Sequence, residues 1–476
     1  RTTNIGDLMS LIIPANSAAG GGGYQVANSL RFDDGSSDYL RWNSSPSGNR
    51  QKFTFSVWLK RSSLTTSMIA SCSYSSSDEG YLFFDSNDKL TWQTSASGMG
   101  DLKTNKVFRD LSAWYHIVLS VDTTQSTSTN RMKLYINGEQ YTWDGSTTQP
   151  NQNTQIYWNV GGTYYPYIGR RSDGNYFDGY MAEIVQINNA QLAADSFGEF
   201  DSDSGVWKPL ESVADLTFGD TGYYLNFQDS SALGNDVSGE NHDWTSYNLA
   251  AIDQSTDTPT NNFATLNPLN YTSASKTYSF GNTAITASSS GTWCSTLSNF
   301  AVSNGKWYTE YKILSVGSYS AIGVGYQPFN FNSSAYLAGA FLVGEDTGSF
   351  GWRNNGATIS NNQGGTLSSW TTNDILMIAI DMDNEKLYVG KNGTWENSGN
   401  PESGASGTGS VKNLTAGEDY LFVICPRGGG TSVNFGSPSY TISSGNTDGN
   451  DRGNFEYAPP SGYLSLCTSN ISEVLG

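Results

Sequence analysis

The sequence predicts an all-β fold, with two antiparallel β-sandwich (jelly-roll) domains in tandem and an extended N-terminal arm. Composition is the first reason: 52 Gly, 28 Tyr and 13 Trp with only 14% charged residues are typical of short strands joined by many turns. The second reason is that apolar and polar residues alternate over short, recurring segments. The third is that 476 residues with 37% hydrophobic side chains are enough to build more than one core.

Residues 1–23 form the predicted arm. They hold one apolar patch at residues 9–14 and then a glycine run that ends at Gly23. A segment this short and rich in glycine cannot form a core of its own, so we expect it to become ordered against a partner subunit. A frayed terminus without a role is the alternative, and Met9 is a candidate natural start.

The first predicted domain covers residues 24–207. Its strand signals come in quick succession, and the Asn137-Gly138 pair between two of them predicts a tight hairpin. Many short strands without intervening helices indicate an antiparallel sandwich. The expected strands are residues 29–32, 39–42, 53–59, 80–84, 89–92, 114–121 and 132–136.

Five motifs of this domain, in chain order, resemble the successive strands of a laminin-G-like, concanavalin A-like jelly roll. The resemblance implies a fold of two sheets. It also implies a family whose members mostly bind sugars or proteins and are only sometimes glycosidases. The motifs lie at residues 53–60, 114–118, 134–138, 168–170 and 177–184.

Residues 208–269 are predicted to be an aspartate-rich connector. The loop around Asp229, Asp236 and Asp243 is dense in the residues that fix turns by bonding their own backbone. Trp244, Phe263 and Leu266 are too large and apolar for a Gly/Ser linker, which would behave as a random coil. We therefore expect this connector to be packed on both of its neighbours.

Residues 270–442 carry a second strand series, which resembles a SPRY domain and is followed by a C-terminal tail at residues 443–476. The turns Asp383-Asn384 and Asn392-Gly393 are expected to fix its register. SPRY-like folds are binding modules. The motifs are residues 305–311, 321–326, 350–356, 375–384, 386–393, 420–424 and 433–436.

The connector segments at residues 229–239 and 257–262 and the C-terminal segment at residues 454–470 complete the layout of jelly roll, aspartate-rich connector, SPRY-like domain and tail. This layout resembles a group of virion proteins of marine bacteriophages. The resemblance implies a structural protein located on the phage particle, with other virion proteins and a host-surface glycan or receptor as partners. A tail-fibre adhesin is the first expectation, a capsid decoration or connector protein the second, and an envelope-polysaccharide depolymerase the third. Closed homo-oligomers are the usual assemblies, and we expect a trimer.

Charge and hydropathy exclude two other classes of partner. The net charge of −19 and the pI of about 4.4 repel a phosphate backbone, so nucleic acid is not an expected ligand. No apolar run reaches the ~18 residues that a transmembrane helix needs, so membrane insertion is not expected either.

Catalysis is not expected. Glycosidases of this fold need two or three carboxylates on one strand, and the corresponding strand offers only Glu183, for which a local partner is expected. His116 and His242 are not accompanied by a Gly-x-Ser-x-Gly motif, and each is interpreted as a structural residue.

The candidate carbohydrate-binding residues are aromatic side chains crowded into one Asn/Gln-rich region, because sugar rings stack on aromatic faces. Core or subunit-interface positions are the alternative. The candidates are Trp143, Tyr157, Trp158, Tyr164, Tyr165 and Tyr167.

Calcium is the one candidate cofactor. Asp229, Asp236 and Asp243 are the first set of possible ligands, and Asp33, Asp34 and Asp38 form a second acidic cluster. Neither spacing is that of an EF-hand, and turn-forming aspartates are the alternative. The four cysteines, without CxxC spacing, are interpreted as buried thiols, with a disulfide as the alternative.

Overall fold

The computed structural model describes residues 23–75, 78–96, 101–145, 148–269, 276–288, 293, 295–326, 343–344, 348–360 and 363–475. These residues divide into two compact units. The N-terminal unit ends at Asn262 and the C-terminal unit begins at Phe263. The predicted arm, apart from Gly23, and Cys294 lie outside the described residues. The all-β prediction with antiparallel sandwiches is confirmed.

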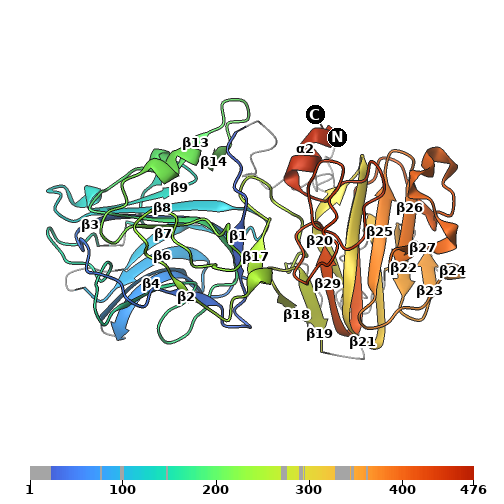
Figure 1. Ribbon diagram of the computed structural model, residues 1–476, viewed down its shortest axis with the longest axis horizontal. Coiled ribbons are helices and arrows are strands. Elements are labelled where there is room, and N and C mark those ends of the chain that lie inside the picture. Colours follow the sequence, from blue (N-terminus) through green and yellow to red (C-terminus); the bar gives the residue numbers. More distant parts are fainter. Residues whose placement is uncertain are drawn as a thin grey trace, which may run out of the picture. The chain divides into compact units, whose positions relative to one another are not determined.

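Two stacked sheets make up the N-terminal unit (Figure 1). Sheet A has the order β10 (Glu139–Tyr141), β9 (Met132–Ile136), β8 (Tyr115–Asp122), β3 (Lys52–Arg61), β12 (Gly179–Asn188), β1 (Ser29–Phe32), β17 (Gln254–Ser255), and β15 (Tyr223–Leu225) also pairs with β12. Sheet B has the order β16 (Thr245–Tyr247), β2 (Tyr39–Arg41), β11 (Tyr165–Ile168), β4 (Ser67–Ser75), β5 (Asp78–Phe84), β6 (Lys89–Thr94), β7 (Leu102–Val107).

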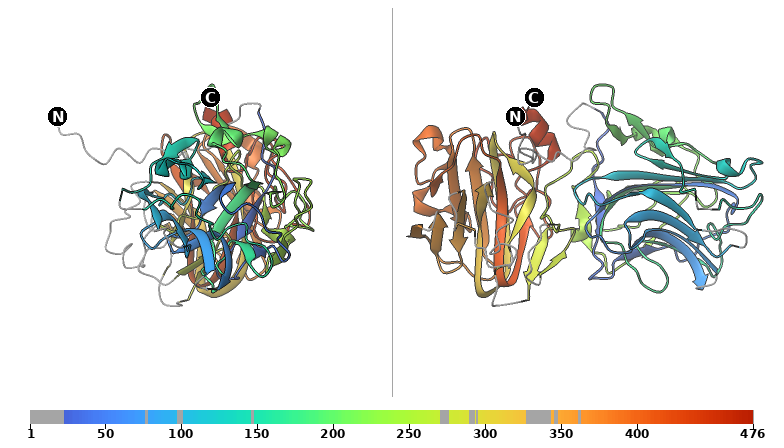
Figure 2. Two further views of the ribbon diagram at one scale, coloured as in Figure 1. Left: turned by 90° about the vertical axis from the view of Figure 1, so that its left-hand side faces the viewer. Right: turned by 180° about the vertical axis from the view of Figure 1, so that it is seen from behind.

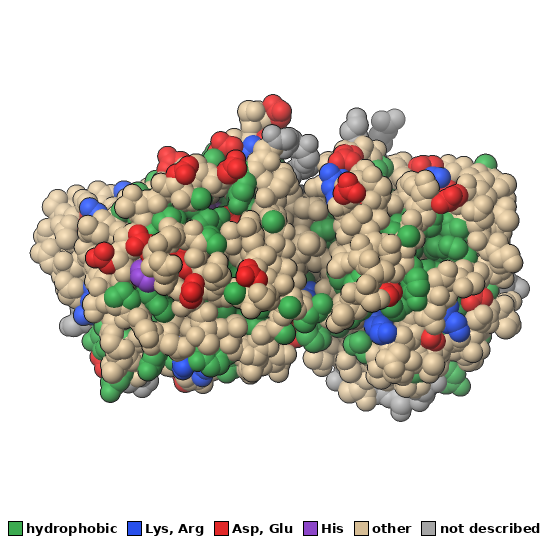
Figure 3. Space-filling view, viewed as in Figure 1, with side chains coloured by type: hydrophobic (Ala, Val, Ile, Leu, Met, Phe, Trp, Pro, Cys, Tyr) green, Lys and Arg blue, Asp and Glu red, His purple; other side chains and the backbone are tan. Residues whose placement is uncertain are grey.

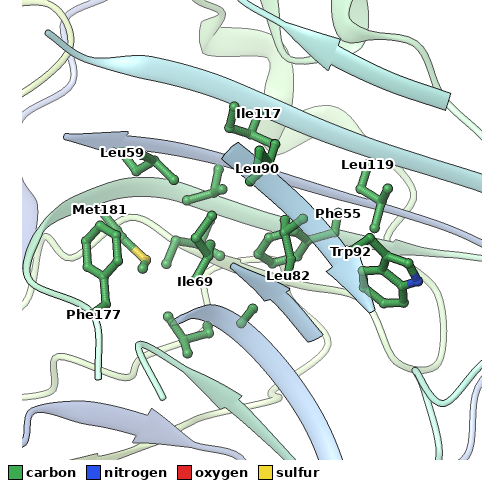
Figure 4. Close-up of a cluster of buried hydrophobic side chains, with 14 of the residues drawn as sticks. Phe55, Leu59, Ile69, Leu82, Leu90, Trp92, Ile117, Leu119, Phe177 and Met181 are labelled. Atoms are coloured by element: carbon green, nitrogen blue, oxygen red, sulfur yellow. The ribbon is translucent and has the colours of Figure 1, made fainter. Parts of the chain in front are cut away.

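The main core of this unit lies between the two sheets. Alternation along β3 turns Phe55 and Leu59 inward, where they belong to one cluster with Ile69 of β4 and Leu82 of β5. Figure 4 shows these side chains pointing into a shared layer. Each such side chain stabilises the fold by about 1.5–3 kcal/mol on full burial.

The outer face of sheet A is buried as well. Trp58 and Trp114 lie on this face and pack with Phe197, Trp207 and Phe218 from later in the chain. Part of this cover is the hairpin formed by β13 (Gly198–Phe200) and β14 (Trp207–Pro209). Polar residues of the central strands are therefore removed from solvent too.

The boundary between the predicted first domain and the connector is displaced. Residues 208–262 supply β15 to sheet A, β16 to the edge of sheet B and β17 to the edge of sheet A, and Trp244 lies in the core between the sheets. The segment is therefore part of the N-terminal unit. Strands of two or three residues carry too little alternation to be recognised from the sequence.

The C-terminal unit is built on a 12-stranded sheet. Its long strands, β21 and β29, pair with each other through two irregularities in register. The strands are β18 (Lys276–Ser279), β19 (Ala284–Ala287), β20 (Thr296–Val302), β21 (Lys306–Tyr326), β22 (Ser349–Arg353), β23 (Ala357–Ser360), β24 (Gln363–Thr366), β25 (Ile375–Asp381), β26 (Lys386–Lys391), β27 (Thr394–Trp395), β28 (Lys412–Asn413) and β29 (Tyr420–Asn434).

The two halves of β21 belong to different layers of this unit. Residues 306–312 pair with β25, whereas residues 321–325 pair with β22. Ile378 of β25 and Trp352 of β22 are buried in one common cluster, so the two halves of the sheet face each other as a sandwich. The right-hand view of Figure 2 shows the strands of this unit from behind.

The predicted hairpin turns are present in both units. Asn137 and Gly138 join β9 to β10, and Asn392 and Gly393 join β26 to β27. All four residues have positive φ angles, which is the backbone conformation that Asn-Gly pairs favour in two-residue hairpins.

Residues 443–475 are an integral part of the C-terminal unit, although the sequence predicts a tail. Leu466 and Ile471 lie in its core, and Leu464 forms a bridge with Trp307. The last described element is α2 (Thr468–Leu475). Short 3-10 helices lie in the loops of both units: η1 (Ser128–Asn130), η2 (Ala194–Ser196), η3 (Glu211–Asp215), η4 (Ala251–Asp253), η5 (Glu396–Ser398) and η6 (Pro401–Ser406).

Candidate functional site

The strongest candidate site is an aromatic and cationic surface on the outer side of sheet B. It extends over β16, β2 and β11 and the loop that follows β11. We call it the tyrosine–arginine face, and it consists of Tyr39, Arg41, Tyr165, Tyr167, Arg170, Tyr176 and Tyr247.

Strand alternation explains why these side chains share one face. Leu40 of β2 and Ile168 of β11 point into the core, so their neighbours Tyr39, Arg41 and Tyr167 point outward. The register places Tyr247 of β16 opposite Tyr39, and Tyr167 opposite Arg41. Residues that are far apart in the sequence thereby form one continuous row.

The rings lie against one another. Tyr39 and Tyr247 are stacked, with 4.5 Å between ring centroids and an interplanar angle of 2°. The ring centroids of Tyr167 and Tyr176 lie 6.0 and 6.3 Å from that of Tyr39. Aromatic pairs in this range contribute about 0.5–1.5 kcal/mol beyond the area that they bury, so the face is held in shape by its own side chains.

Two guanidinium groups complete this layer. The guanidinium carbon of Arg41 lies 4.8 Å from the ring centroid of Tyr247 and 5.1 Å from that of Tyr165. Arg170 lies 4.5 Å from the ring centroid of Tyr39. Stacking of this kind orients the planar guanidinium while leaving its N–H groups available for hydrogen bonds.

Neither arginine is ion-paired within the described part of the chain. Arg41 donates to the Asn43 side chain and to the Tyr247 hydroxyl, and Arg170 donates to the backbone oxygens of Arg171 and Ser172. In a chain of net charge −19, acidic side chains are plentiful, and they are scattered over the surface in Figure 3. The two positive charges are therefore available to an anionic ligand.

Two of the six predicted carbohydrate-binding residues lie on the tyrosine–arginine face, namely Tyr165 and Tyr167. Tyr167 is mostly covered, and burial raises the pKa of its hydroxyl. Trp143 and Trp158 are core residues instead. The indole of Trp143 donates to the Met132 oxygen at 2.9 Å.

The other two predicted residues, Tyr157 and Tyr164, belong to a separate aromatic group. Their rings are stacked with centroids 6.0 Å apart, and the ring centroid of Tyr74 lies 5.5 Å from that of Tyr164. Arg50 lies 5.1 Å from the Tyr157 ring centroid. The six aromatic residues that are crowded together in the sequence therefore lie in three different places: the core, this separate group and the tyrosine–arginine face.

The acidic connector loop does not form a metal cluster. Asp236 accepts hydrogen bonds from the backbone of Tyr224 and His242, and Asp243 accepts one from the backbone of Asp236. Asp229 is bound separately by Ser231. No group of three or more His, Cys, Asp or Glu side chains suited to a metal is found in the described ranges. These aspartates fix turns, which is the alternative interpretation of the sequence.

The second acidic cluster is also engaged by its own backbone. Asp33 accepts from the Gly35 amide at 2.9 Å, and Asp38 accepts from the Asp33 amide at 3.0 Å. Burial, with Asp253 and Asp33 nearby, raises the pKa of Asp38 to about 7. Burial also raises the pKa of Asp34.

His116 is built into the covered face of sheet A. Its Nδ1 accepts from the Trp207 indole at 2.9 Å, so the neutral ring carries its proton on Nε2 and donates it to Ser56 Oγ at 2.8 Å. A histidine that donates to a serine does not activate that serine as a nucleophile. Burial lowers the pKa of His116 to about 3.

Glu183 has distant partners rather than the predicted local one. Tyr224 and Tyr24 both donate to its carboxylate. Glu183 lies at an irregularity in the pairing of β12 with β3 and has a φ of 49°. Burial raises its pKa to about 7.

Comparison with known proteins relates the first part of the chain to a family. Residues 34–195 match Laminin_G_3, the concanavalin A-like lectin/glucanases superfamily. The matched region carries β2 and β11 and most of the tyrosine–arginine face. The comparison with curated proteins finds no match.

Two solved structures are similar to parts of the chain. The SPRY domain of human HERC1 matches with a TM-score of 0.25 and 17% identity, over 32% of this chain and 87% of that one. The stonustoxin structure matches with a TM-score of 0.28 and 17% identity, over 36% of this chain and 27% of its own. At these scores neither assigns the C-terminal unit to a family, so its SPRY-like character stays a prediction. No helix among the described residues has the length and apolar character needed to cross a membrane.

Proposed function

We propose that this chain is a non-catalytic glycan-binding protein, and that its tyrosine–arginine face binds an acidic polysaccharide. The observation that carries the proposal is the stack of Tyr39 on Tyr247 next to Arg41 and Arg170, neither of which has a carboxylate partner among the described residues. The half-buried rings of Tyr165, Tyr176 and Tyr247 offer apolar surface to sugars, and Tyr39, which is 8% exposed, packs against Tyr247. Guanidinium groups offer forked donors to carboxylate or sulfate.

The arrangement of these side chains in a row along sheet B favours a polymer as the ligand. Small molecules bind in concave pockets that surround most of their surface. Here the side chains lie side by side along strands β16, β2 and β11, as the register of Tyr247, Tyr39, Arg41 and Tyr167 requires. Such a row suits successive units of an extended chain, whose small contributions add up along the polymer.

We propose a phage particle as the biological setting. The resemblance to virion proteins of marine bacteriophages supports a place on the surface of a phage particle, where a tail-fibre adhesin would hold host glycan. A decoration or connector protein that binds other virion proteins is the second candidate. The absence of catalysis is part of the proposal, supported by the use of His116 Nδ1 and Nε2 in structural hydrogen bonds.

Binding to an array of acidic and neutral polysaccharides tests the proposal. We expect retention on uronic-acid or sulfated polymers and none on neutral ones. Arg41→Gln and Tyr247→Ala should each weaken binding about 10-fold, which corresponds to about 1.4 kcal/mol. Phe200→Ala is the matched control, because it removes a 52% exposed aromatic residue from the same unit but away from sheet B. Equal binding by all variants would contradict the proposed site.

A further inference from the structure

Two arginines of the C-terminal unit lie on the outer side of its sheet, on either side of β21. Arg353 of β22 pairs with Ala321, and Arg427 of β29 pairs with Tyr319. Trp352, the neighbour of Arg353, points into the core, so Arg353 points to the opposite side. Ala321 and Cys425 are buried in the small cluster on that same outer side.

Among the residues that the structure describes, these two arginines have no hydrogen-bonding partner. Within the described ranges, no hydrogen bond or ion pair is made by the guanidinium of Arg353 or Arg427, and the Nε atom of each is buried without an acceptor. Each of the other described arginines donates at least one hydrogen bond: Arg31, Arg41, Arg50, Arg61, Arg109, Arg131, Arg170, Arg171 and Arg452. A buried donor without an acceptor normally costs stability.

One aromatic group brings the two arginines together. The guanidinium carbons of Arg353 and Arg427 lie 5.7 and 5.9 Å from the ring centroid of Trp293. Arg427 also lies 5.5 Å from the ring centroid of Tyr319, a side chain that is 41% exposed. Two like charges thus share one indole ring, and no carboxylate of the described part of the chain pairs with either of them.

We propose that Arg353, Arg427, Trp293 and Tyr319 form a binding site for the carboxylate of an acidic saccharide unit, such as a uronic acid. Guanidinium forks match the geometry of a carboxylate, and one anion between two arginines removes their mutual repulsion. The indole and phenol rings supply the apolar surface on which a sugar ring stacks. The site belongs to the C-terminal unit and does not depend on the proposed role of the tyrosine–arginine face.

Binding of trigalacturonate tests the site, with neutral trigalactose and triglutamate as comparison ligands. The full-length chain should carry Arg41→Gln and Arg170→Gln in every measurement, so that binding at the tyrosine–arginine face is removed. We expect trigalacturonate to quench tryptophan fluorescence and to bind measurably in calorimetry. Arg353→Gln and Arg427→Gln should each weaken this binding about 10- to 100-fold, because a charge-assisted hydrogen bond is lost.

Arg452→Gln is the matched control, because it removes the same charge from the same unit at an arginine paired with Glu473. Its affinity for trigalacturonate should be unchanged. Without ligand, Arg353→Gln and Arg427→Gln should keep or raise the melting temperature, since each removes an uncompensated charge. Equal affinity in all variants, a clear fall in melting temperature, or equally tight binding of triglutamate would overturn the proposal.

Discussion

Replacing Glu183 by Gln should stabilise the N-terminal unit above pH 7 and leave it almost unchanged near pH 4.5. Glu183 is 4% exposed, and its carboxylate accepts from the hydroxyls of Tyr224 and Tyr24. An amide oxygen can accept the same hydrogen bonds. The substitution therefore keeps shape and partners while removing the buried charge.

The size of the effect follows from the pKa. Burial raises the pKa of Glu183 from its ordinary value of 4.5 to about 7, and each pKa unit corresponds to about 1.4 kcal/mol. Between these two values the folded chain keeps a proton that the unfolded chain has released. Stability of the natural chain therefore falls as the pH rises through this window, by roughly 3 kcal/mol at most, and is then constant.

Urea unfolding at pH 4.5, 5.5, 6.5 and 8 measures the effect. Hydrogen exchange of peptides from β12 should be followed, because it reports the N-terminal unit separately. The advantage of Glu183→Gln should grow from near zero at pH 4.5 to roughly 3 kcal/mol at pH 8. Glu199→Gln is the control, since the Glu199 side chain is 54% exposed, and it should change little.

A constant difference between Glu183→Gln and the natural chain at all four pH values would refute this reasoning. It would mean that Glu183 is already ionised in the folded protein near pH 4.5. Loss of stability at pH 8 would refute it more strongly, because the carboxylate would then be a stabilising charge.

Three further predictions concern buried groups. Asp257→Asn should destabilise the fold by about 3–5 kcal/mol in thermal unfolding, because Lys60 is buried against Asp257 and loses its counter-charge. Adding Lys60→Met should recover part of this stability, and no recovery would contradict the pairing. The imidazole of His116, with a pKa lowered to about 3, should show no titration by NMR between pH 8 and 4.5, and a midpoint near pH 6 would contradict its burial. Because the unfolded ring binds a proton near pH 6.5, the contribution of the buried neutral ring to stability is lost as the pH falls from 6.5 towards 3. Burial raises the pKa values of Cys72 and Cys467 to about 12 and about 11. Both thiols should react with iodoacetamide at pH 8 only after urea unfolding, as measured by mass spectrometry of their peptides, and rapid labelling of the folded chain would contradict their burial.

Local patterns predicted the strands of both units but not all of their surroundings. The alternation in β3 correctly turns Phe55 and Leu59 into the core, and the Asn-Gly turns lie where they were expected. The same alternation suggests that Ser56 and Lys60 face solvent, yet they are 1% exposed. Ser56 is covered by His116 and by Trp207 of the later hairpin, and Lys60 is covered by Asp257 and Asn262. Such long-range packing leaves no local signal in the sequence.

The candidate site was predicted only in part for the same reason. Tyr165 and Tyr167 were recognised within a crowded aromatic segment, but Tyr39 and Tyr247 are more than two hundred residues apart and meet only because β2 pairs with β16. The alternation of Tyr39, Leu40 and Arg41 already places the tyrosine and arginine on one face. The alternation does not reveal that β16 is the strand that pairs with β2.

Hydroxyl-radical footprinting of the chain, with and without an acidic polysaccharide that it binds, tests whether the tyrosine–arginine face is the glycan-binding surface. We expect oxidation of Tyr247 and Tyr165 to fall when the polymer is bound. Oxidation of Tyr74, which is 60% exposed on the same unit, should be unchanged. Protection of Tyr74 with unchanged oxidation of Tyr247 and Tyr165 would contradict the claim that the tyrosine–arginine face binds glycan.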